Sequence, residues 1–79
     1  MTNREKLNNV LCKTFRVEES QLRDLQFGSN NWDSIGHITM VTELEAAFSI
    51  SISSEDIMKM SAYNEIVKLL EESYGVNFE

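Results

Sequence analysis

No proline interrupts this chain of 79 residues, and its three glycines, Gly28, Gly36 and Gly75, stand far apart. Through most of the sequence, apolar residues recur every three to four positions, as they do along one face of an α-helix. Runs of β-branched residues, which favour strands, are few. The pattern therefore predicts an all-α fold.

The first helix is expected over about residues 3–15. Thr2 and Glu5 precede and enter it with the spacing of a capping box, in which side chains satisfy two otherwise unpaired backbone N–H groups. The second helix is expected over about residues 34–48. Asp33 stands immediately before it and is a good N-cap, because its carboxylate can accept from the first exposed N–H groups.

A short helix near residues 54–59 follows Ser53, which has the spacing of an N-cap. The last helix is expected over about residues 62–74, with Ser61 as its cap. Gly75 comes next and suits the left-handed conformation that often ends a helix. Together with the two helices before them, these segments predict a small bundle of three main helices and one short helix.

Two segments lack the helical period. Residues 16–32 form a long expected loop, in which Leu22, Leu25 and Phe27 are expected to be anchored in the core. Residues 49–53 alternate serine with isoleucine, but no clear partner strand exists, so this segment is interpreted as a loop whose isoleucines contact the core.

The composition limits the function. A length of 79 residues allows one domain, taken as residues 1–79. Thirteen acidic and seven basic residues give a net charge of −6, which argues against nucleic acid and anionic membrane surfaces and favours partners with basic docking faces. Cys12 is the sole cysteine, so no intrachain disulfide is possible. No apolar run of signal-peptide or membrane-helix type is visible, and we expect a cytoplasmic protein. Nothing in the sequence suggests an obligate oligomer.

A serine stands where the second helix is expected to begin, in the run Asn-Trp-Asp-Ser-Ile-Gly-His-Ile at residues 31–38. A helix start offers unpaired N–H groups and the positive end of the helix dipole, so it can hold a phosphate group. Taken alone, Ser34 has an ordinary interpretation as a solvent-facing serine of the first turn.

This run resembles the attachment site of acyl carrier proteins, in which a 4′-phosphopantetheine arm is esterified to the serine of an Asp-Ser-Leu motif. The third residue here is Ile35. The resemblance covers essentially the whole chain: it includes the helix order, the long loop before the site, the element Leu44-Glu45-x-x-Phe48 and the last helix led by Ser61.

The resemblance implies that Ser34 bears 4′-phosphopantetheine, transferred from coenzyme A by a phosphopantetheinyl transferase with Mg²⁺. It implies that Asp33 assists the transferase and caps the helix, and that Ile35 lies on an exposed patch beside the arm. The second helix would be the recognition helix, and its docking face is expected to include Ile38, Thr42 and Glu45.

The implied function is that of a non-catalytic carrier, which holds acyl intermediates as thioesters and delivers them to acyl-loading and acyl-using enzymes of lipid or polyketide biosynthesis. Only Glu43 and Glu45 are acidic between residues 34 and 48. Together with the Gly36-His37 pair, this is more typical of specialised pathways than of general fatty-acid synthesis. Candidates to line a cavity for the acyl chain are Phe48, Ile52, Met60 and Ala62.

Other residues near the site have plainer interpretations. We expect His37 to be a solvated surface histidine, Trp32 to be partly buried, and Cys12 to pack as a small hydrophobe. Asp33, Ser34 and His37 all fall within one helical turn, which makes a hydrolase triad improbable. The alternative function is a helical adaptor domain that binds a partner helix without any prosthetic group. The two functions differ in whether Ser34 is modified.

Overall fold

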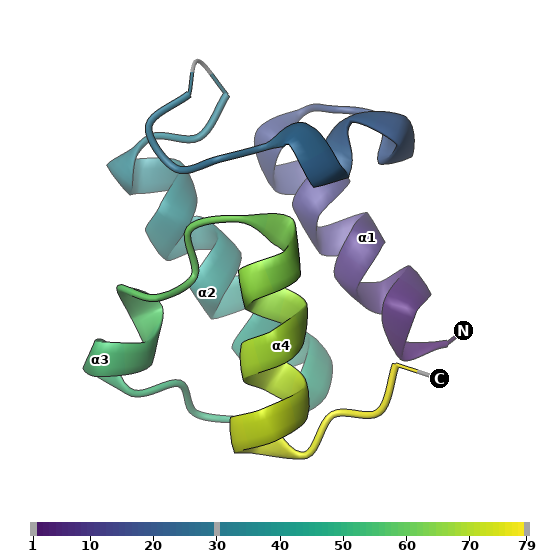
Figure 1. The fold of residues 1–79 in the computed structure, drawn as a ribbon, viewed down its shortest axis with the longest axis vertical. Coiled ribbons are helices and arrows are strands. Elements are labelled where there is room, and N and C mark those ends of the chain that lie inside the picture. Colours follow the sequence, from purple (N-terminus) through teal and green to yellow (C-terminus); the bar gives the residue numbers. More distant parts are fainter. Residues whose placement is uncertain (1, 30, 79) are drawn as a thin grey trace.

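The computed structural model describes residues 2–29 and 31–78, and its regular elements there are all helical (Figure 1). They are α1 (Asn3–Phe15), the 3₁₀ helix η1 (Glu19–Asp24), α2 (Ser34–Phe48), α3 (Ser54–Ile57) and α4 (Tyr63–Tyr74). The predicted bundle of three main helices and one short helix is confirmed, and η1 is an addition to it.

The first helix begins at the predicted capping box. The Glu5 N–H donates to the Thr2 hydroxyl at 3.1 Å, and the Thr2 N–H donates to the Glu5 carboxylate at 2.8 Å. The last turn ends at Arg16, which adopts the left-handed conformation with φ of 57°. A local sequence signal therefore set the start of α1, whereas its end carries a residue that this conformation does not favour.

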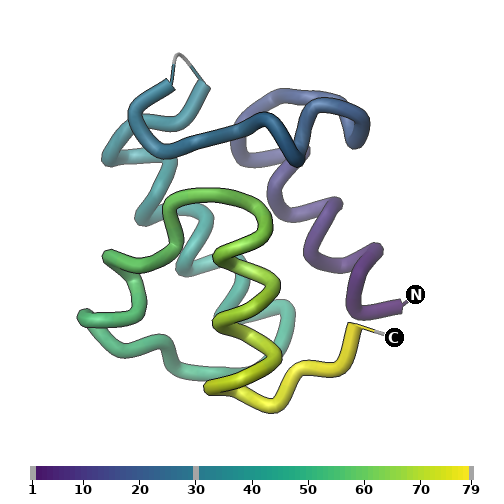
Figure 2. Tube along the Cα trace, in the orientation of Figure 1, coloured from purple at the N-terminus to yellow at the C-terminus, as the bar shows by residue number. Residues whose placement is uncertain are grey.

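The connection between α1 and α2 crosses one end of the bundle and contains η1, which the prediction of a loop missed (Figure 2). The 3₁₀ helix buries only Leu22, so it leaves no apolar period in the sequence. Leu22 and Leu25 are buried, as expected. The expectation for Phe27 is wrong, because 48% of its surface is exposed.

The helix α3 starts at the predicted cap, where the Ser53 hydroxyl accepts from the Asp56 N–H at 3.2 Å. It ends at Ile57, earlier than expected. The cap predicted for the last helix is wrong: α4 starts after Ala62, and no side chain caps it. Ser61 instead places its carbonyl against the Phe27 N–H at 2.9 Å, beside the isolated bridge of residues 26 and 62.

One continuous core fills the space between the helices. Its most deeply buried side chains come from every part of the chain and include Leu7, Leu11, Leu22, Trp32, Met40, Leu44, Met60, Ile66 and Leu70. The predicted contact of the isoleucine-serine segment is confirmed, since Ile52 is buried. The start of α1 lies beside the segment after α4: the Asn3 side chain donates to the Asn77 carbonyl at 2.8 Å (Figures 1 and 2).

Three main helices end in a left-handed residue, and only one of these residues is glycine. Gly75 follows α4 with φ of 67°, as predicted, whereas Ser49 follows α2 with φ of 54°.

Because a Cβ is unfavourable in the left-handed conformation by about 1–2 kcal/mol, Ser49→Gly should raise the free energy of unfolding and Gly75→Ala should lower it, each by about 1 kcal/mol. Urea unfolding of both variants measures these changes. A change of the same sign in the free energy of unfolding of the two variants would contradict the prediction.

Asp56 ties α3 to the end of α4. Its carboxylate accepts from the Tyr74 hydroxyl at 2.6 Å, and this hydrogen bond, above all, holds the pKa of Asp56 below its usual value of 3.8, assisted by Ser53 and Lys59. A lowered pKa stabilises the fold above pH 3.8, and this stabilisation is lost as the pH falls through the folded-state value.

Tyr74→Phe should therefore raise the pKa of Asp56 toward 3.8 and weaken its contribution to the acid sensitivity of the fold. Carboxyl-carbon chemical shifts followed against pH measure this directly. Glu5 is the internal control. Its pKa is lowered by hydrogen bonds with Thr2, near the start of the chain, and should not change when Tyr74 is replaced. An unchanged Asp56 midpoint in the variant would show that Tyr74 does not cause the shift.

Candidate functional site

Ser34 is the first residue of α2, and its side chain is exposed. The predicted cap is confirmed: Asp33 accepts the Gly36 N–H on its carboxylate at 2.8 Å and the His37 N–H on its carbonyl at 2.9 Å. The N–H groups of Ser34 and Ile35 have no acceptor among the residues that the structure describes. The helix start therefore presents a hydroxyl together with two open backbone donors.

Gly36 lets this helix start lie close against α1. A Cβ at position 36 would stand 3.2 Å from Cε1 of Phe15 and 3.3 Å from the Asp33 carboxylate, which is tighter than most side chains tolerate. The position therefore favours glycine because of the close approach. On the preceding segment, the Asn31 side-chain amide donates to the Phe15 carbonyl at 3.2 Å and holds the loop end against the same helix.

His37 and Trp32 form a buried hydrogen-bonded pair just below the exposed serine. The Trp32 indole N–H donates to Nδ1 of His37 at 3.0 Å, and Nε2 of His37 lies 2.7 Å from the Ile57 carbonyl. Because an indole can only donate and a carbonyl can only accept, Nδ1 is the acceptor and Nε2 carries the proton. The pair joins the loop before α2, the first turn of α2 and the end of α3.

The expectations for these two residues are therefore wrong. His37 is 8% exposed rather than solvated, and Trp32 is fully buried, stacked on Phe15 with 4.6 Å between ring centroids. The partner that buries His37 is a carbonyl twenty residues later, which no local pattern could indicate. Both ring nitrogens are occupied, so Asp33, Ser34 and His37 do not form a hydrogen-bonded triad.

Four large apolar side chains lie exposed on the segments around the serine, and we call them the apolar rim: Phe27, Ile35, Ile38 and Met58. Ile35 is 78% exposed and Met58 is 84% exposed, whereas an apolar residue on a well-covered helix face would be buried. The bond from His37 to the Ile57 carbonyl brings together the segments of α2 and α3 that carry part of this rim.

The three residues expected on a docking face differ in their surroundings. Ile38 and Thr42 are exposed, and the Thr42 hydroxyl donates to the Ile38 carbonyl at 3.1 Å. Glu45 is half-buried, and its carboxylate accepts from the Ile52 N–H at 2.7 Å, so it holds the connection after α2. Their role in docking stays a prediction.

A shallow, mostly apolar pocket of about 160 Å³ lies between the rim and His37; it is lined by Phe27, His37, Ile57, Met58, Met60 and Ser61. The ring of Phe27 meets that of His37 edge-on, with centroids 5.1 Å apart. Of the four residues expected to line an acyl cavity, only Met60 lies in this pocket. Ile52 is buried in the core, and Phe48 lines a different hollow near the chain ends.

Cys12 is half-buried against the core, in agreement with the prediction that it packs as a small hydrophobe. Burial raises the pKa of its thiol, and the negative charges of Glu19 and Glu18 raise it further. Because the thiolate is the reactive form, this cysteine is a poor nucleophile at neutral pH.

The part of the chain that the structure describes contains no cluster of three or more residues able to hold a metal ion. None of its helices is both long enough and apolar enough to cross a bilayer. Comparison with known proteins gives no match to a protein-family model and no match to a solved structure.

The hydrogen bond between Trp32 and His37 predicts the tautomer of the histidine. Nitrogen chemical shifts of neutral His37 should show the proton on Nε2. In Trp32→Phe the Ile57 carbonyl still requires this proton, so the tautomer should stay the same, and the Nδ1 shift should change because this nitrogen loses its donor. The same variant should lower the free energy of unfolding by about 1–3 kcal/mol, because a buried acceptor loses its donor.

Phe15→Leu is the matched control for this measurement. It removes the ring stacked on Trp32 without removing the hydrogen bond, so it should destabilise the fold and leave the Nδ1 shift of His37 unchanged. A proton on Nδ1 in the parent protein would contradict the assignment.

Proposed function

We propose that this protein is an acyl carrier protein that bears 4′-phosphopantetheine on Ser34. The observation that carries the proposal is the exposed hydroxyl at the first position of α2, beside two backbone N–H groups without acceptors among the described residues. An ordinary first-turn serine needs none of the further features around it, namely the apolar rim and the shallow pocket next to His37.

The residues at the helix start fit a phosphodiester. Ser34 supplies the oxygen that is esterified, and the N–H groups of Ser34 and Ile35 are available to phosphate oxygens. The first turn of α2 contains no acidic side chain, so Asp33 at the cap is the only carboxylate of the turn to oppose the phosphate charge, and it is engaged by Gly36. When attached, the arm supplies a thiol that holds an acyl group as a thioester.

The pocket beside the site supports a short acyl group. Its volume of about 160 Å³ is small compared with the roughly 300–1,000 Å³ of pockets that enclose drug-sized ligands. Buried His37 and Met60 form its inner side, and the exposed Met58 and Phe27 belong to its mouth. A small acyl group or the end of a chain fits there, which favours a specialised pathway over general fatty-acid synthesis.

The partners proposed for this carrier are a phosphopantetheinyl transferase and acyl-loading and acyl-using enzymes. The net charge of −6 favours encounter with basic docking faces. On α2 itself, Glu45 is engaged by the Ile52 N–H, so Glu43 remains the acidic residue free to meet such a face. Ile35 and Ile38 then contribute most of the contact, and docking at α2 is expected to be mainly apolar.

The protein is proposed to act as a cytoplasmic monomer with no catalytic residue of its own. Each partner enzyme would carry out its own chemistry on the acyl group. The carrier contributes an exposed attachment point and a fixed arrangement of the rim around it, so that the tethered group has a high effective concentration at the partner's site.

The adaptor function remains the second candidate, because the exposed side chains of Ile35 and Met58 would serve a partner helix equally well. An adaptor has no use for the Ser34 hydroxyl. The chemical state of that hydroxyl after exposure to a transferase therefore distinguishes the two functions.

The test is the intact mass after incubation with coenzyme A, Mg²⁺ and a broad-specificity phosphopantetheinyl transferase. The parent protein should gain one phosphopantetheine, and Ser34→Ala should gain none. Because Ser34 is exposed, the variant should keep its free energy of unfolding within about 0.5 kcal/mol of the parent value.

Ser54→Ala is the matched control, since Ser54 is the first residue of α3 and is also exposed. It should be modified as fully as the parent. Loading of Ser34→Ala, or failure of several transferases to modify a folded parent chain, would overturn the proposal and leave the adaptor function.

A further inference from the structure

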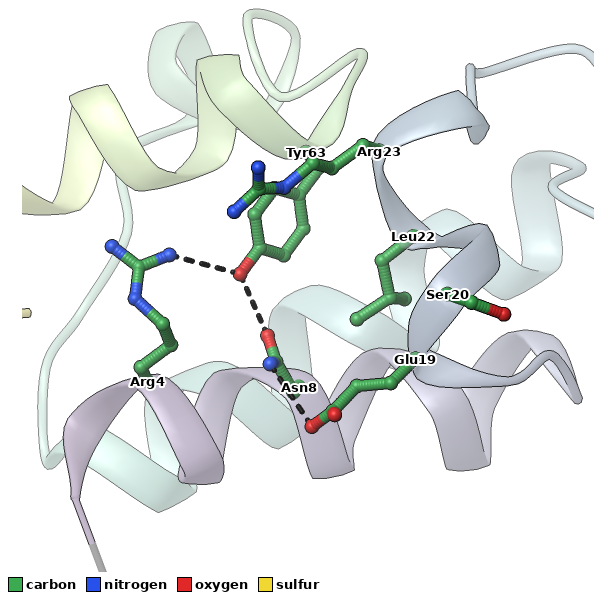
Figure 3. A pocket seen from close by; sticks show the side chains of 7 residues that line it. All are labelled: Arg4, Asn8, Glu19, Ser20, Leu22, Arg23 and Tyr63. Carbon is green, nitrogen blue, oxygen red and sulfur yellow. Dashed lines mark hydrogen bonds between the residues drawn. The ribbon is translucent and has the colours of Figure 1, made fainter.

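A second pocket, of about 410 Å³, lies at the junction of α1, η1 and α4 (Figure 3). We call it the arginine pocket; its lining residues are Arg4, Asn8, Glu19, Ser20, Leu22, Arg23 and Tyr63. None of them belongs to α2 or α3, so this pocket is separate from the Ser34 site. Its volume lies within the roughly 300–1,000 Å³ typical of sites for small molecules.

A chain of hydrogen bonds with one direction crosses this pocket. Arg4 donates to the Tyr63 hydroxyl at 3.1 Å, which donates to the Asn8 carbonyl oxygen at 2.7 Å, and the Asn8 amide donates to Glu19 at 3.2 Å (Figure 3). The chain runs from a cation to a carboxylate, so each bond polarises the next. It fixes the orientation of the Asn8 side chain and engages Glu19, and it joins the three helices.

Most side-chain N–H groups of the two arginines in this pocket are not engaged by the network. Arg4 donates one of its five side-chain N–H groups to Tyr63, and the Arg23 side chain makes no hydrogen bond or ion pair with any of the described residues. The one ion pair among those residues joins Lys59 and Asp56, elsewhere in the fold. The other described lysines and arginines likewise make no ion pair, and Arg4 and Arg23 differ from them in that both line this pocket.

Both guanidinium groups are already held in place by aromatic rings. Arg23 lies over the ring of Tyr63 at 6.0 Å from its centroid, and Arg4 lies over the ring of Phe78 at 5.6 Å. Contact over a ring occupies the face of a guanidinium and leaves the N–H donors at its edge. These side chains therefore lose little further freedom when they bind an oxyanion.

We propose that the arginine pocket binds a small organic oxyanion, either a carboxylate or a phosphate ester. The charged head meets Arg4 and Arg23, whose planar groups suit both oxyanions. The body of the ligand lies in the mouth of the pocket, above Leu22 and the Tyr63 ring, which are 2% and 4% exposed and form the floor. Glu19, on the other side of Asn8, disfavours a second negative group, so the ligand has one anionic end. The proposal does not depend on the modification of Ser34.

The test is a titration followed by amide chemical shifts at constant ionic strength, with benzoate and phenyl phosphate as probes. Both carry one anionic head and an aromatic body, and comparing them shows which head the pocket prefers. Benzamide is the uncharged control of the same shape. Saturable shifts should be confined to the residues of the arginine pocket, and benzamide should cause none of them.

Arg23→Gln should weaken binding of the preferred probe about tenfold, the scale of one charge-assisted contact. Lys68→Gln is the matched control, because it removes the same charge from the exposed side of α4, outside this pocket. It should leave the dissociation constant unchanged. Arg23→Lys should be weakened nearly as much as Arg23→Gln, since lysine lacks the planar fork.

Three results would overturn the proposal: no saturable shift with either anion, equal weakening by Arg23→Gln and Lys68→Gln, or equal binding of benzamide. The amide spectrum of each variant shows whether that variant is folded. If Arg23→Gln does not fold, Arg4→Gln is measured in its place. Ser34→Ala should bind the probe as the parent does, so failure here and failure of the carrier function are separate results.

Discussion

The indole N–H of Trp32 donates to His37 and thereby determines how the rest of the site is arranged. It commits Nδ1 of the ring to accepting, which leaves the Nε2 proton for the Ile57 carbonyl. Without this pair, a buried imidazole beneath the apolar rim would hold an unsatisfied polar atom, which costs about 1–3 kcal/mol. The shallow pocket, the first turn of α2 and the end of α3 thus share one buried hydrogen-bonded link.

Local signals in the sequence were sufficient for most of the fold. The capping box at Thr2 and Glu5, the cap at Asp33 and the left-handed Gly75 each act within one turn, so their residue types indicate the structure directly. The spacing of apolar residues every three to four positions likewise indicated the main helices. Ser61 shows the limit of such signals, because its carbonyl serves the bridge to the segment of Phe27 and its side chain does not cap α4.

The rest depended on contacts between distant parts of the chain. The burial of His37 rests on a carbonyl twenty residues away, and η1 buries a single leucine, so neither leaves a periodic pattern. The arginine pocket could not be predicted from the sequence for the same reason, since it combines residues 4, 23 and 63 from three helices. By contrast, the exposed position of Ser34 and its cap could be predicted, because both lie within the run of residues 33–36.

The proposed carrier function requires that Ser34 is modified in the living cell. Trypsin should release residues 24–59 as one peptide, because no lysine or arginine lies between Arg23 and Lys59. Fragmentation of this peptide from the protein purified out of its native source measures the modification directly. The proposed function predicts one phosphopantetheine group on Ser34, and a peptide in which Ser34 is entirely unmodified would contradict it.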